Sequence, residues 1–495
     1  MKNNNLKKYL KLFSFPLVFI LFCTIFNPSE SNPKIGIMIG IAIWMLGWWV
    51  TDIVPVAITS LLPILLFPLT GIISGEEISK VYFNEVVFLY IGGFLLALSI
   101  EKWEVHKRIA SRTLIVFGQG TFQILAGFML VTSLLSMWMS NTSIALLMLP
   151  IGISVLDKLK EIYSEKELGK FKTALLLGIA YASSIGGMAT LIGTPTNLVF
   201  KKIYETSFKS GFKINFANWM IFAFPIYFIL IIAAFLILYL FFKPNKKLEI
   251  IDNTFFKIEN MKLGKTPYEQ KVVLFVFLLF ALLMIFRADI VIGSFQIPGW
   301  SSLFNHSDYI IDAVVAAFIS ILLFIIPSKN RPGNTIMDWE TASKIPWGII
   351  LLFGGGFALE KGFEVSGLTH WIASKIGLLS GNEMIIIILT TCFIAILMTQ
   401  FIANVTVAQA LLPLCVALSI SLKINSLFLM IPITFGASAA FLLPISTPPN
   451  AILFATGQIK MKEMLLPGLI LIIISGIVIS LAMNYWGTYV FGITK

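Results

Sequence analysis

Two short polar motifs interrupt otherwise apolar stretches of this 495-residue chain. One is Ser140-Asn141-Thr142, and the other is Ala403-Asn404-Val405, whose asparagine lies 263 positions later. Amide and hydroxyl oxygens of this kind coordinate hard cations, and their N–H and O–H groups donate hydrogen bonds to anions. The residue types therefore indicate reversible binding of a cation and a small polar ligand, and not the making or breaking of covalent bonds.

The motifs belong to a longer internal duplication. Pro150 is matched by Pro413, and Gly92-Gly93-Phe94 by Gly355-Gly356-Phe357, each at the same offset of 263. A fourth pair follows at an offset of 253, namely Gly193-Thr194-Pro195-Thr196-Asn197 and Ser446-Thr447-Pro448-Pro449-Asn450. One polar motif in a membrane helix is more often a contact between helices. Matches that recur in the same order favour a binding site in a transporter built from two repeats.

The composition predicts a membrane protein. Hydrophobic residues make up 58% of the chain and charged residues only 12%, whereas a soluble domain has about 25% charged residues. Apolar runs of near-spanning length recur throughout, and a spanning helix needs about 20 such residues. We expect an all-α polytopic membrane protein with about eleven transmembrane helices and two re-entrant hairpins.

The net charge of +11 does not indicate a nucleic-acid partner, because most lysines and arginines lie in short segments between apolar runs. That distribution follows the positive-inside rule and predicts a cytoplasmic N-terminus. No small-residue cleavage site follows the first apolar run, so we expect it to remain as a span. Lys201, Lys202, Lys209 and Lys213 are exceptions, because this topology places them on the outer side.

The duplication divides the chain into two halves. The first half covers residues 1–242 with a hairpin at 121–157, and the second covers residues 272–495 with a hairpin at 383–422. The polar segment 243–271 is expected to be a cytoplasmic linker and not a folded domain. The number of spans between matched elements places the second hairpin on the opposite face of the membrane, which makes an inverted repeat.

The polar breaks suit ion binding more than catalysis. Helix N-termini at the breaks carry partial positive charge that attracts anions, and loop carbonyls with hydroxyl oxygens suit Na⁺. The sequence shows no chain of carboxylates and histidines for proton relay, no nucleotide-binding glycine loop and no Ser/His/Asp arrangement. An enzyme is therefore not expected. The few charged residues near span ends are expected at the membrane interface: Glu85, Glu101, Arg287, Asp312 and Glu360.

At these residues the chain resembles the divalent-anion:sodium symporter family of dicarboxylate, citrate and sulfate carriers. The segment from Ser136 to Thr142 is similar to the first signature of that family, and the segment from Thr447 to Ile452 to its second broken helix. The resemblance covers nearly the whole chain. It implies a homodimer in which each protomer has a scaffold domain and a transport domain that moves like an elevator.

The resemblance also implies roles for individual residues. It implies Na⁺ as the coupling ion, no organic cofactor, and a small dianion held without an arginine clamp. The substrate would meet Asn141, Thr142, Thr194, Asn404 and Thr447. The Na⁺ ligands would come from Ser140, Asn141, Gly193, Asn404, Ser446 and Thr447.

The second motif departs from the family pattern. Ala403 and Val405 stand where the family usually has serine and threonine, so two hydroxyls are missing. A hydrogen bond to a charged group contributes about 1.5–3 kcal/mol, which implies a substrate that is smaller, less charged or differently oriented than succinate. Thr406 also carries a hydroxyl and could replace a missing one, but one position along a helix turns its side chain by about 100° away from that of Val405. Thr196, where a second proline is common, can return one donor to the pocket.

The leading hypothesis is Na⁺-coupled uptake of a divalent anion, most plausibly a four-carbon dicarboxylate such as succinate or malate. Alternatives on the same fold are sulfate or citrate uptake and a sodium-independent anion exchanger. A non-transporting membrane scaffold or receptor and a channel are further alternatives from other classes. The compact architecture favours a bacterial inner membrane.

Overall fold

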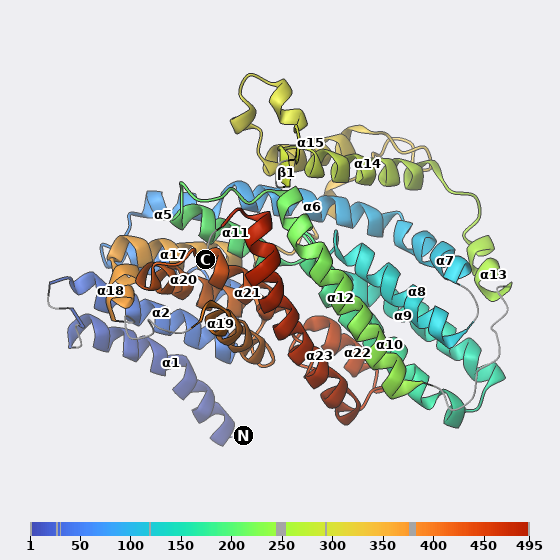
Figure 1. Cartoon of the computed structure of the whole chain (residues 1–495), viewed down its shortest axis with the longest axis horizontal. Helices are drawn as coiled ribbons and strands as arrows, with labels where there is room; N and C mark the ends of the chain where they lie inside the picture. The colour runs from blue at the N-terminus through green and yellow to red at the C-terminus, as the bar shows by residue number, and fades with distance from the viewer. Residues whose placement is uncertain are drawn as a thin grey trace.

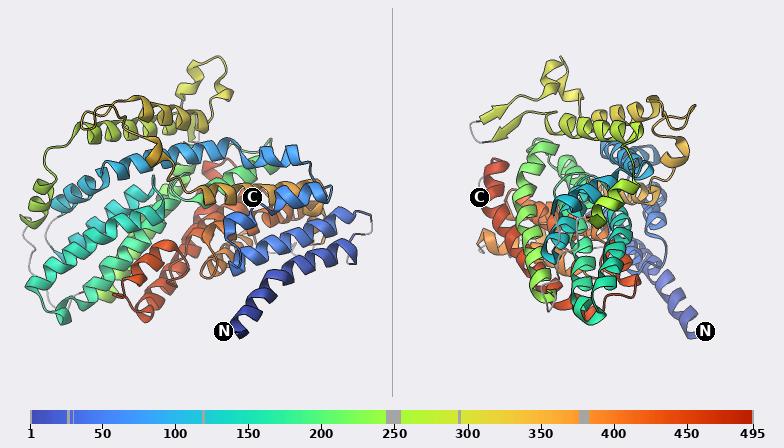
Figure 2. Two further views of the ribbon diagram at one scale, coloured as in Figure 1. Left: turned by 180° about the vertical axis from the view of Figure 1, so that it is seen from behind. Right: turned by 90° about the vertical axis from the view of Figure 1, so that its right-hand side faces the viewer.

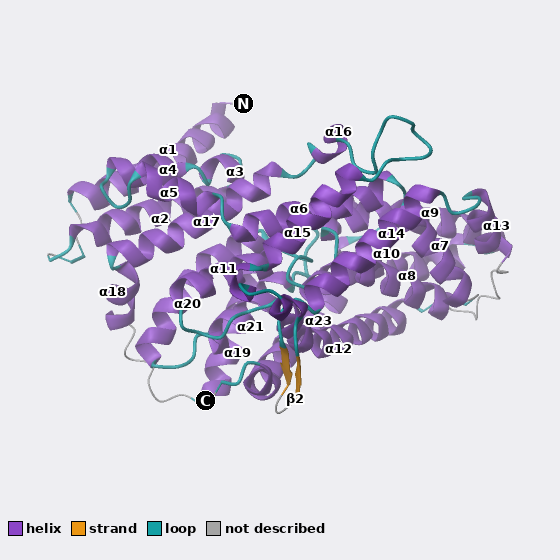
Figure 3. Ribbon diagram, turned by 90° about the horizontal axis from the view of Figure 1, so that it is seen from above, coloured by secondary structure: helices purple, strands orange, loops and turns teal. Residues whose placement is uncertain are grey.

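The computed structural model describes residues 2–25, 28–29, 31–117, 120–243, 254–292, 295–375 and 383–493. The regular structure of these residues is mainly helical, with loops between the helices, as Figure 3 shows. The exception is one antiparallel pair of short strands, β1 (Ile290–Ile292) and β2 (Phe295–Ile297), with Ile290 opposite Ile297. The expected α-helical class is confirmed for this part of the chain.

The first half contains twelve helices among the described residues. They are α1 (Lys2–Thr24), α2 (Pro33–Thr51), α3 (Val56–Thr59), α4 (Leu62–Leu69), α5 (Gly75–Tyr82), α6 (Glu85–Lys102), α7 (Val105–Phe117), α8 (Thr121–Ser136), α9 (Asn141–Ile162), α10 (Glu165–Met188), α11 (Pro195–Ser207) and α12 (Phe216–Phe242).

The described residues after α12 contain the remaining helices. They are α13 (Thr254–Lys262), α14 (Tyr268–Ile285), η1 (Trp300–Leu303), η2 (Ser307–Tyr309), α15 (Asp312–Ile325), α16 (Trp339–Ala342), α17 (Trp347–Ser366), α18 (Leu368–Lys375), α19 (Met384–Thr399), α20 (Asn404–Leu422), α21 (Leu427–Ser438), α22 (Pro448–Ala455), α23 (Met461–Leu481), η3 (Ala482–Gly487, a π-helix) and α24 (Thr488–Val490).

Eight helical segments among the described residues are long and apolar enough to cross a bilayer. Six shorter apolar helices accompany them, including α8, α15, α19 and α21. The polytopic class is therefore confirmed, and the finer expectation of about eleven spans with two re-entrant hairpins stays a prediction.

The helices fall into two groups, one of which packs around the polar breaks. The helices that carry or flank the breaks contact one another: α10 packs on α8, α9, α12 and α22, α12 packs on α23, and α19 packs on α21 and α23. Figure 1 shows α8, α9, α10 and α12 side by side at one end of the molecule. We call α8–α12 and α19–α23 the site-bearing helices.

A second group lies against these helices. In it α6 packs on α14 and α15, and α17 packs on α2, α3, α4 and α5. Figure 2 shows α14 and α15 along one edge of the molecule, with the segment around η1 and η2 projecting beyond them. We call α2–α6, α14, α15 and α17 the frame helices.

Part of the expected linker at 243–271 can be described. Residues 244–253 lie outside the described residues, and the rest contains α13 and the turn at Gly264, whose φ is +63°. Arg108 of α7 is buried and donates from Nε to Gln270 Oε1 (2.7 Å), from Nη1 to Gly264 O (3.0 Å) and from Nη2 to Leu263 O (2.8 Å). This fork of donors fixes the end of the linker to α7.

A lysine whose side chain is only 9% exposed makes a comparable connection within the frame. Lys102 at the end of α6 forms an ion pair with Asp338 at 2.8 Å, and its ammonium also donates to Ile336 O at 2.9 Å. The hydrogen bond from Lys102 holds the pKa of the Asp338 carboxyl well below its usual range. The carboxylate is thus charged at neutral pH and keeps the loop before α16 against α6.

Replacing Arg108 with lysine is predicted to destabilise the protein, because a lysine ammonium cannot reproduce the planar fork that reaches three acceptors. The expected loss is about 1.5–3 kcal/mol, measured as a lower midpoint of thermal unfolding in detergent. Arg112→Lys is the matched control on the same helix, because Arg112 is exposed and, among the described residues, donates a single side-chain hydrogen bond, to Thr266 Oγ1 at 3.3 Å. Equal midpoints for the two variants would contradict the assignment.

Candidate functional site

The first polar motif forms the connection between α8 and α9. Ser140 caps α9 by accepting from Ser143 N at 3.1 Å, and its hydroxyl also donates to Ser143 Oγ at 2.8 Å. Asn141 is the first residue of α9, and its Oδ1 lies 2.8 Å from the hydroxyl of Ser136. The same hydroxyl lies 2.6 Å from Ser183 O of α10. The motif is therefore held against α10 by the serine that precedes the connection.

The broken helix α10–α11 closes around this motif. Residues 189–194 separate the two helices, and the side-chain amide of Asn197 donates to Gly187 O (3.2 Å) and Thr190 O (2.7 Å). A Cβ atom added to Gly187 would lie 2.4 Å from Asn141 Oδ1 and 3.0 Å from Gly193 O. The absence of a side chain at Gly187 thus lets two predicted site residues, Asn141 and Gly193, approach each other.

The second motif repeats this arrangement between α19 and α20. The hydroxyl of Thr399 lies 2.8 Å from Asn404 Oδ1 and 2.6 Å from Ala437 O. Thr399 is 263 positions after Ser136, so the residue that holds each asparagine occupies a matching place. The hydrogen bonds that hold Asn141 Oδ1 and Asn404 Oδ1 are therefore duplicated along with the sequence.

The second broken helix, α21–α22, also repeats the bonds of the first. The side-chain amide of Asn450 donates to Ala440 O (3.0 Å), Leu443 O (3.2 Å) and Ser446 Oγ (3.1 Å). Ala440, Leu443 and Asn450 are each 253 positions after Gly187, Thr190 and Asn197. Thr447 caps α22 through a 3.4 Å bond from Asn450 N to its hydroxyl.

The two broken helices are joined directly. Thr196 Oγ1 and Ser438 Oγ lie 2.8 Å apart, and Tyr181 donates from its hydroxyl to Phe441 O at 3.0 Å. The buried hydroxyl of Thr196 thus contacts α21 and also lies 3.4 Å from Thr194 Oγ1, and the expectation that it returns a donor to the pocket stays a prediction. No hydrogen bond within the described part of the chain joins Asn141 to Asn404.

The departure at Ala403 has a clear structural consequence. The methyl group of Ala403 cannot cap α20, and the hydroxyl of Thr406 has no hydrogen-bond partner among the described residues although Thr406 is only 1% exposed. Thr406 occupies the place of Ser143, whose hydroxyl receives a bond from Ser140. The change from serine to alanine thus leaves both the helix end and a buried hydroxyl without the partner that the first motif has.

The remaining predicted site residues line the two breaks. Thr194 and Thr447 are the buried residues that precede α11 and α22, and Thr142 and Asn404 are half-buried on the first turns of α9 and α20. Ser446 donates from its hydroxyl to Leu443 O at 2.6 Å. Each break therefore collects neutral oxygen atoms and helix N-termini.

Sequence reasoning did not assign Ser136, Gly187 or Thr399 to the site. A signal for two of them was available, because Ser136 and Thr399 each stand five residues before an asparagine and differ by the same offset of 263. Gly187 carries no such signal, since its counterpart is Ala440. Its role depends on the closeness of Asn141, which only the folded chain reveals.

The oxygen atoms at the first break fit a sodium ion. Asn141 Oδ1 and Gly193 O converge at Gly187, and hard monovalent cations prefer uncharged and carboxylate oxygens of this type. At the second break Asn404 Oδ1 and the carbonyls of residues 437–443 supply the same atom types. The first break therefore fits a Na⁺ ion by the convergence of its oxygen atoms, and the second by atom type alone.

Comparison with known proteins identifies the family of the chain. Residues 6–493 match the family described as the sodium:sulfate symporter transmembrane region. The chain belongs to this family. One relative is a sodium-dependent dicarboxylate transporter, SdcS, of Staphylococcus saprophyticus, 37% identical over 498 residues that cover 99% of this chain and 94% of the relative. Another is the protein of the same name from Staphylococcus aureus, 38% identical over 484 residues that cover 97% and 91%.

Membership of the sodium:sulfate symporter family confirms the resemblance that the two motifs carry. It also supports the expectation that this chain is no enzyme, because the family and these relatives are named as transporters. The individual site residues stay predictions.

Ala403→Ser is predicted to stabilise the protein. The new hydroxyl can cap α20 and bond to Thr406, and a serine cap contributes about 0.5–2 kcal/mol relative to alanine. Differential scanning fluorimetry in detergent should show a higher unfolding midpoint. Ser140→Ala at the matching place should lower the midpoint by a similar amount, because it removes the same two bonds. A shift of the same sign in both variants would rule out this explanation.

Proposed function

We propose that this protein is a secondary active transporter that carries a four-carbon dicarboxylate, such as succinate or malate, together with Na⁺. The observation that carries the proposal is the duplicated hydrogen-bond pattern that presents Asn141 and Asn404 beside two interrupted helices. The names of the relatives, sodium-dependent dicarboxylate transporters, supply the substrate class. Two matching breaks provide two cation sites on either side of one substrate.

In this proposal the substrate carboxylates meet neutral donors. Asn141, Thr142 and Asn404 lie at helix starts with accessible side chains, and Thr194 and Thr447 precede the N-termini of α11 and α22. The partial positive charge of a helix N-terminus stabilises an anion by about 0.3–1 kcal/mol. Sodium ions bound beside each asparagine supply the remaining positive charge, so a dianion enters without a buried arginine.

The cation ligands in this proposal are oxygen atoms already bonded within the protein. The first site takes Ser140, Asn141 and the loop at Gly193, and the second takes Asn404, Ser446 and Thr447. Ser136 and Thr399 hold the asparagine oxygens in place. Bound Na⁺ would attract the substrate electrostatically, which makes substrate binding depend on Na⁺.

The packing of the helices supports a proposed movement. The site-bearing helices contact one another more continuously than they contact the frame helices, so we propose that they move together as a transport domain. In this proposal residues 1–242 and 272–495 form an inverted repeat, residues 243–271 link them, and α8–α9 and α19–α20 are re-entrant hairpins. The protein is proposed to be a homodimer in a bacterial plasma membrane with a cytoplasmic N-terminus.

The function is tested by uptake of labelled succinate into proteoliposomes, with and without an inward Na⁺ gradient, with malate, citrate and sulfate as competitors. We expect uptake that requires Na⁺ and is competed by malate. Asn141→Ala and Asn404→Ala should each reduce uptake tenfold or more, about 1.4 kcal/mol. Asn484→Ala is the control, because no hydrogen bond of its side chain is seen among the described residues. Uptake that ignores Na⁺ and requires an internal anion would replace symport with exchange.

Gly187→Ala is predicted to weaken Na⁺ activation of uptake. The added methyl group would lie 2.4 Å from Asn141 Oδ1, so the asparagine must move away from Gly193. Displacing a supporting group commonly costs about 10- to 100-fold in metal affinity, and the half-saturating Na⁺ concentration should rise accordingly. Gly348→Ala on α17 is the control, because its methyl group would meet only Ala57 Cβ at 3.5 Å. Unchanged Na⁺ activation in Gly187→Ala would remove this glycine from the cation site.

A further inference from the structure

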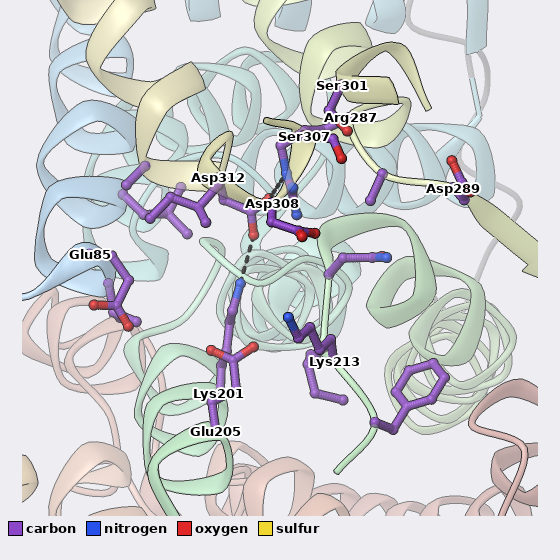
Figure 4. A pocket seen from close by; sticks show the side chains of 18 of the residues that line it. Glu85, Lys201, Glu205, Lys213, Arg287, Asp289, Ser301, Ser307, Asp308 and Asp312 are labelled. Atoms are coloured by element: carbon purple, nitrogen blue, oxygen red, sulfur yellow. Dashed lines mark hydrogen bonds and ion pairs between the residues drawn. The ribbon is translucent and has the colours of Figure 1, made fainter. Parts of the chain in front are cut away.

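A charged cavity of about 640 Å³ lies at the far end of α11 from the proposed site. It is lined by the end of α11, by the starts of α6 and α15, and by the segments around Arg287 and Ser307 (Figure 4). Side chains of both signs reach its wall, and they come from site-bearing and frame helices alike. The cavity therefore marks a charged boundary between the two groups of helices.

Asp312 is at the centre of this boundary. It is the first residue of α15 and only 2% exposed. Its Oδ1 lies 2.6 Å from Arg287 Nε, and its Oδ2 lies 2.7 Å from Lys201 Nζ of α11. Arg287 also donates from Nη1 to Ile310 O at 2.7 Å, which fixes it to the frame. Asp312 was expected at the membrane interface, and the structure shows that it is buried in a cluster of ion pairs.

Two more polar contacts hold α11 to the frame. Lys202 forms an ion pair with Glu85 of α6 at 2.8 Å, and Ser207 donates to Glu360 Oε1 of α17 at 2.9 Å. Together with the Lys201 pair, they connect α11 to three different frame helices. These contacts also give Lys201 and Lys202, which the topology places on the outer side, partners for their charges.

The position of Lys201 on α11 connects this cluster with the proposed site. Thr194 precedes α11, and Lys201 follows seven residues later, which is about 10 Å along a helix. A helix of this length moves as one rigid piece. The cluster therefore fixes one half of the proposed site relative to the frame.

Glu205 offers Lys201 a second partner. It lies one helical turn beyond Lys201 and lines the same cavity, and Figure 4 shows the two side chains next to each other. No ion pair of Glu205 is seen within the described residues. Oppositely charged residues four positions apart on a helix can pair.

These facts allow a change of partners without an unpaired buried charge. When Lys201 leaves Asp312, Asp312 keeps Arg287 and Lys201 can pair with Glu205. An unpaired charge inside a protein costs several kcal/mol, so a cluster without these second partners would hold α11 permanently. Here the two buried charges, Lys201 and Asp312, each have a partner in both arrangements, whereas the half-buried Glu205 gains its partner only in the second.

We propose that Lys201, Asp312 and Arg287 form a latch that holds α11 against the frame, and that Glu205 receives Lys201 when the latch opens. The latch rests on the movement described under the proposed function. It makes Lys201 and Glu205 positioning residues with opposite effects. Loss of Lys201 favours release of α11, and loss of the Glu205 charge favours retention.

The latch is tested by the accessibility of a reporter cysteine. Val86 of α6 is buried and lines the cavity, so Val86→Cys should react with a membrane-impermeant maleimide only when α11 moves away. Cys23 is exposed and is replaced by serine, whereas Cys392 and Cys415 are buried. We expect Lys201→Met to raise the labelling rate about threefold or more and Glu205→Gln to lower it by a similar factor. Lys201→Arg should restore the original rate.

Lys102→Met is the matched control, because Lys102 is an equally buried lysine that pairs with Asp338 at 2.8 Å entirely within the frame. Equal changes in Lys102→Met and Lys201→Met, or shifts of one sign in Lys201→Met and Glu205→Gln, would overturn the latch. Labelling is measured without Na⁺ or substrate. If succinate uptake is absent but labelling changes as expected, the proposed substrate is wrong and the latch stands. If uptake is normal but labelling is unchanged, the latch is wrong and the proposed substrate stands.

Discussion

Carbonyl groups released where a membrane helix stops must find hydrogen bonds inside the protein, and the rest of this structure depends on how two asparagines meet that demand. Asn197 satisfies Gly187 O and Thr190 O at the end of α10, and Asn450 satisfies Ala440 O and Leu443 O beyond α21. Unpaired peptide groups in lipid cost several kcal/mol each. With these bonds in place, both helices can stop at mid-length and leave polar atoms facing one another.

The interrupted helices in turn determine how the two motif asparagines, Asn141 and Asn404, are held. Because α10 ends beside Asn141 and α21 ends beside Asn404, each of these asparagines is held by a hydroxyl, that of Ser136 or Thr399, which also reaches the interrupted helix. The oxygen atoms are thereby held in place, and in the proposed function this arrangement would reduce the entropy lost when an ion binds. Ala403 weakens this arrangement on one side only, since Thr406 lacks the partner that Ser143 has. The two halves are therefore alike in backbone and unequal in hydroxyl groups.

Much of this arrangement was accessible from the sequence. The recurrence of Asn141 as Asn404, and of Asn197 as Asn450, predicted paired breaks in an α-helical membrane protein, and the described helices begin at Asn141, Pro195, Asn404 and Pro448. Gly187 could not be identified, because its importance lies in the closeness of a residue 46 positions earlier in the chain. The fate of the Thr196 hydroxyl was also beyond sequence reasoning, since Ser438 belongs to the other half. Local patterns fix where helices stop, whereas contacts between repeats depend on packing.

The charged residues also show that sequence does not reveal contacts between distant segments. The sequence places Asp312 at the membrane interface and Lys201 on the outer side, because it reveals a charge but not its partner. In the structure both are buried, at 2% and 8% exposure, and each neutralises the other. A buried pair is weak evidence for stability, because desolvation offsets most of the attraction between the charges. Its position between a site-bearing helix and a frame helix, with Arg287 and Glu205 as second partners, instead favours a role in setting how the two groups of helices are arranged.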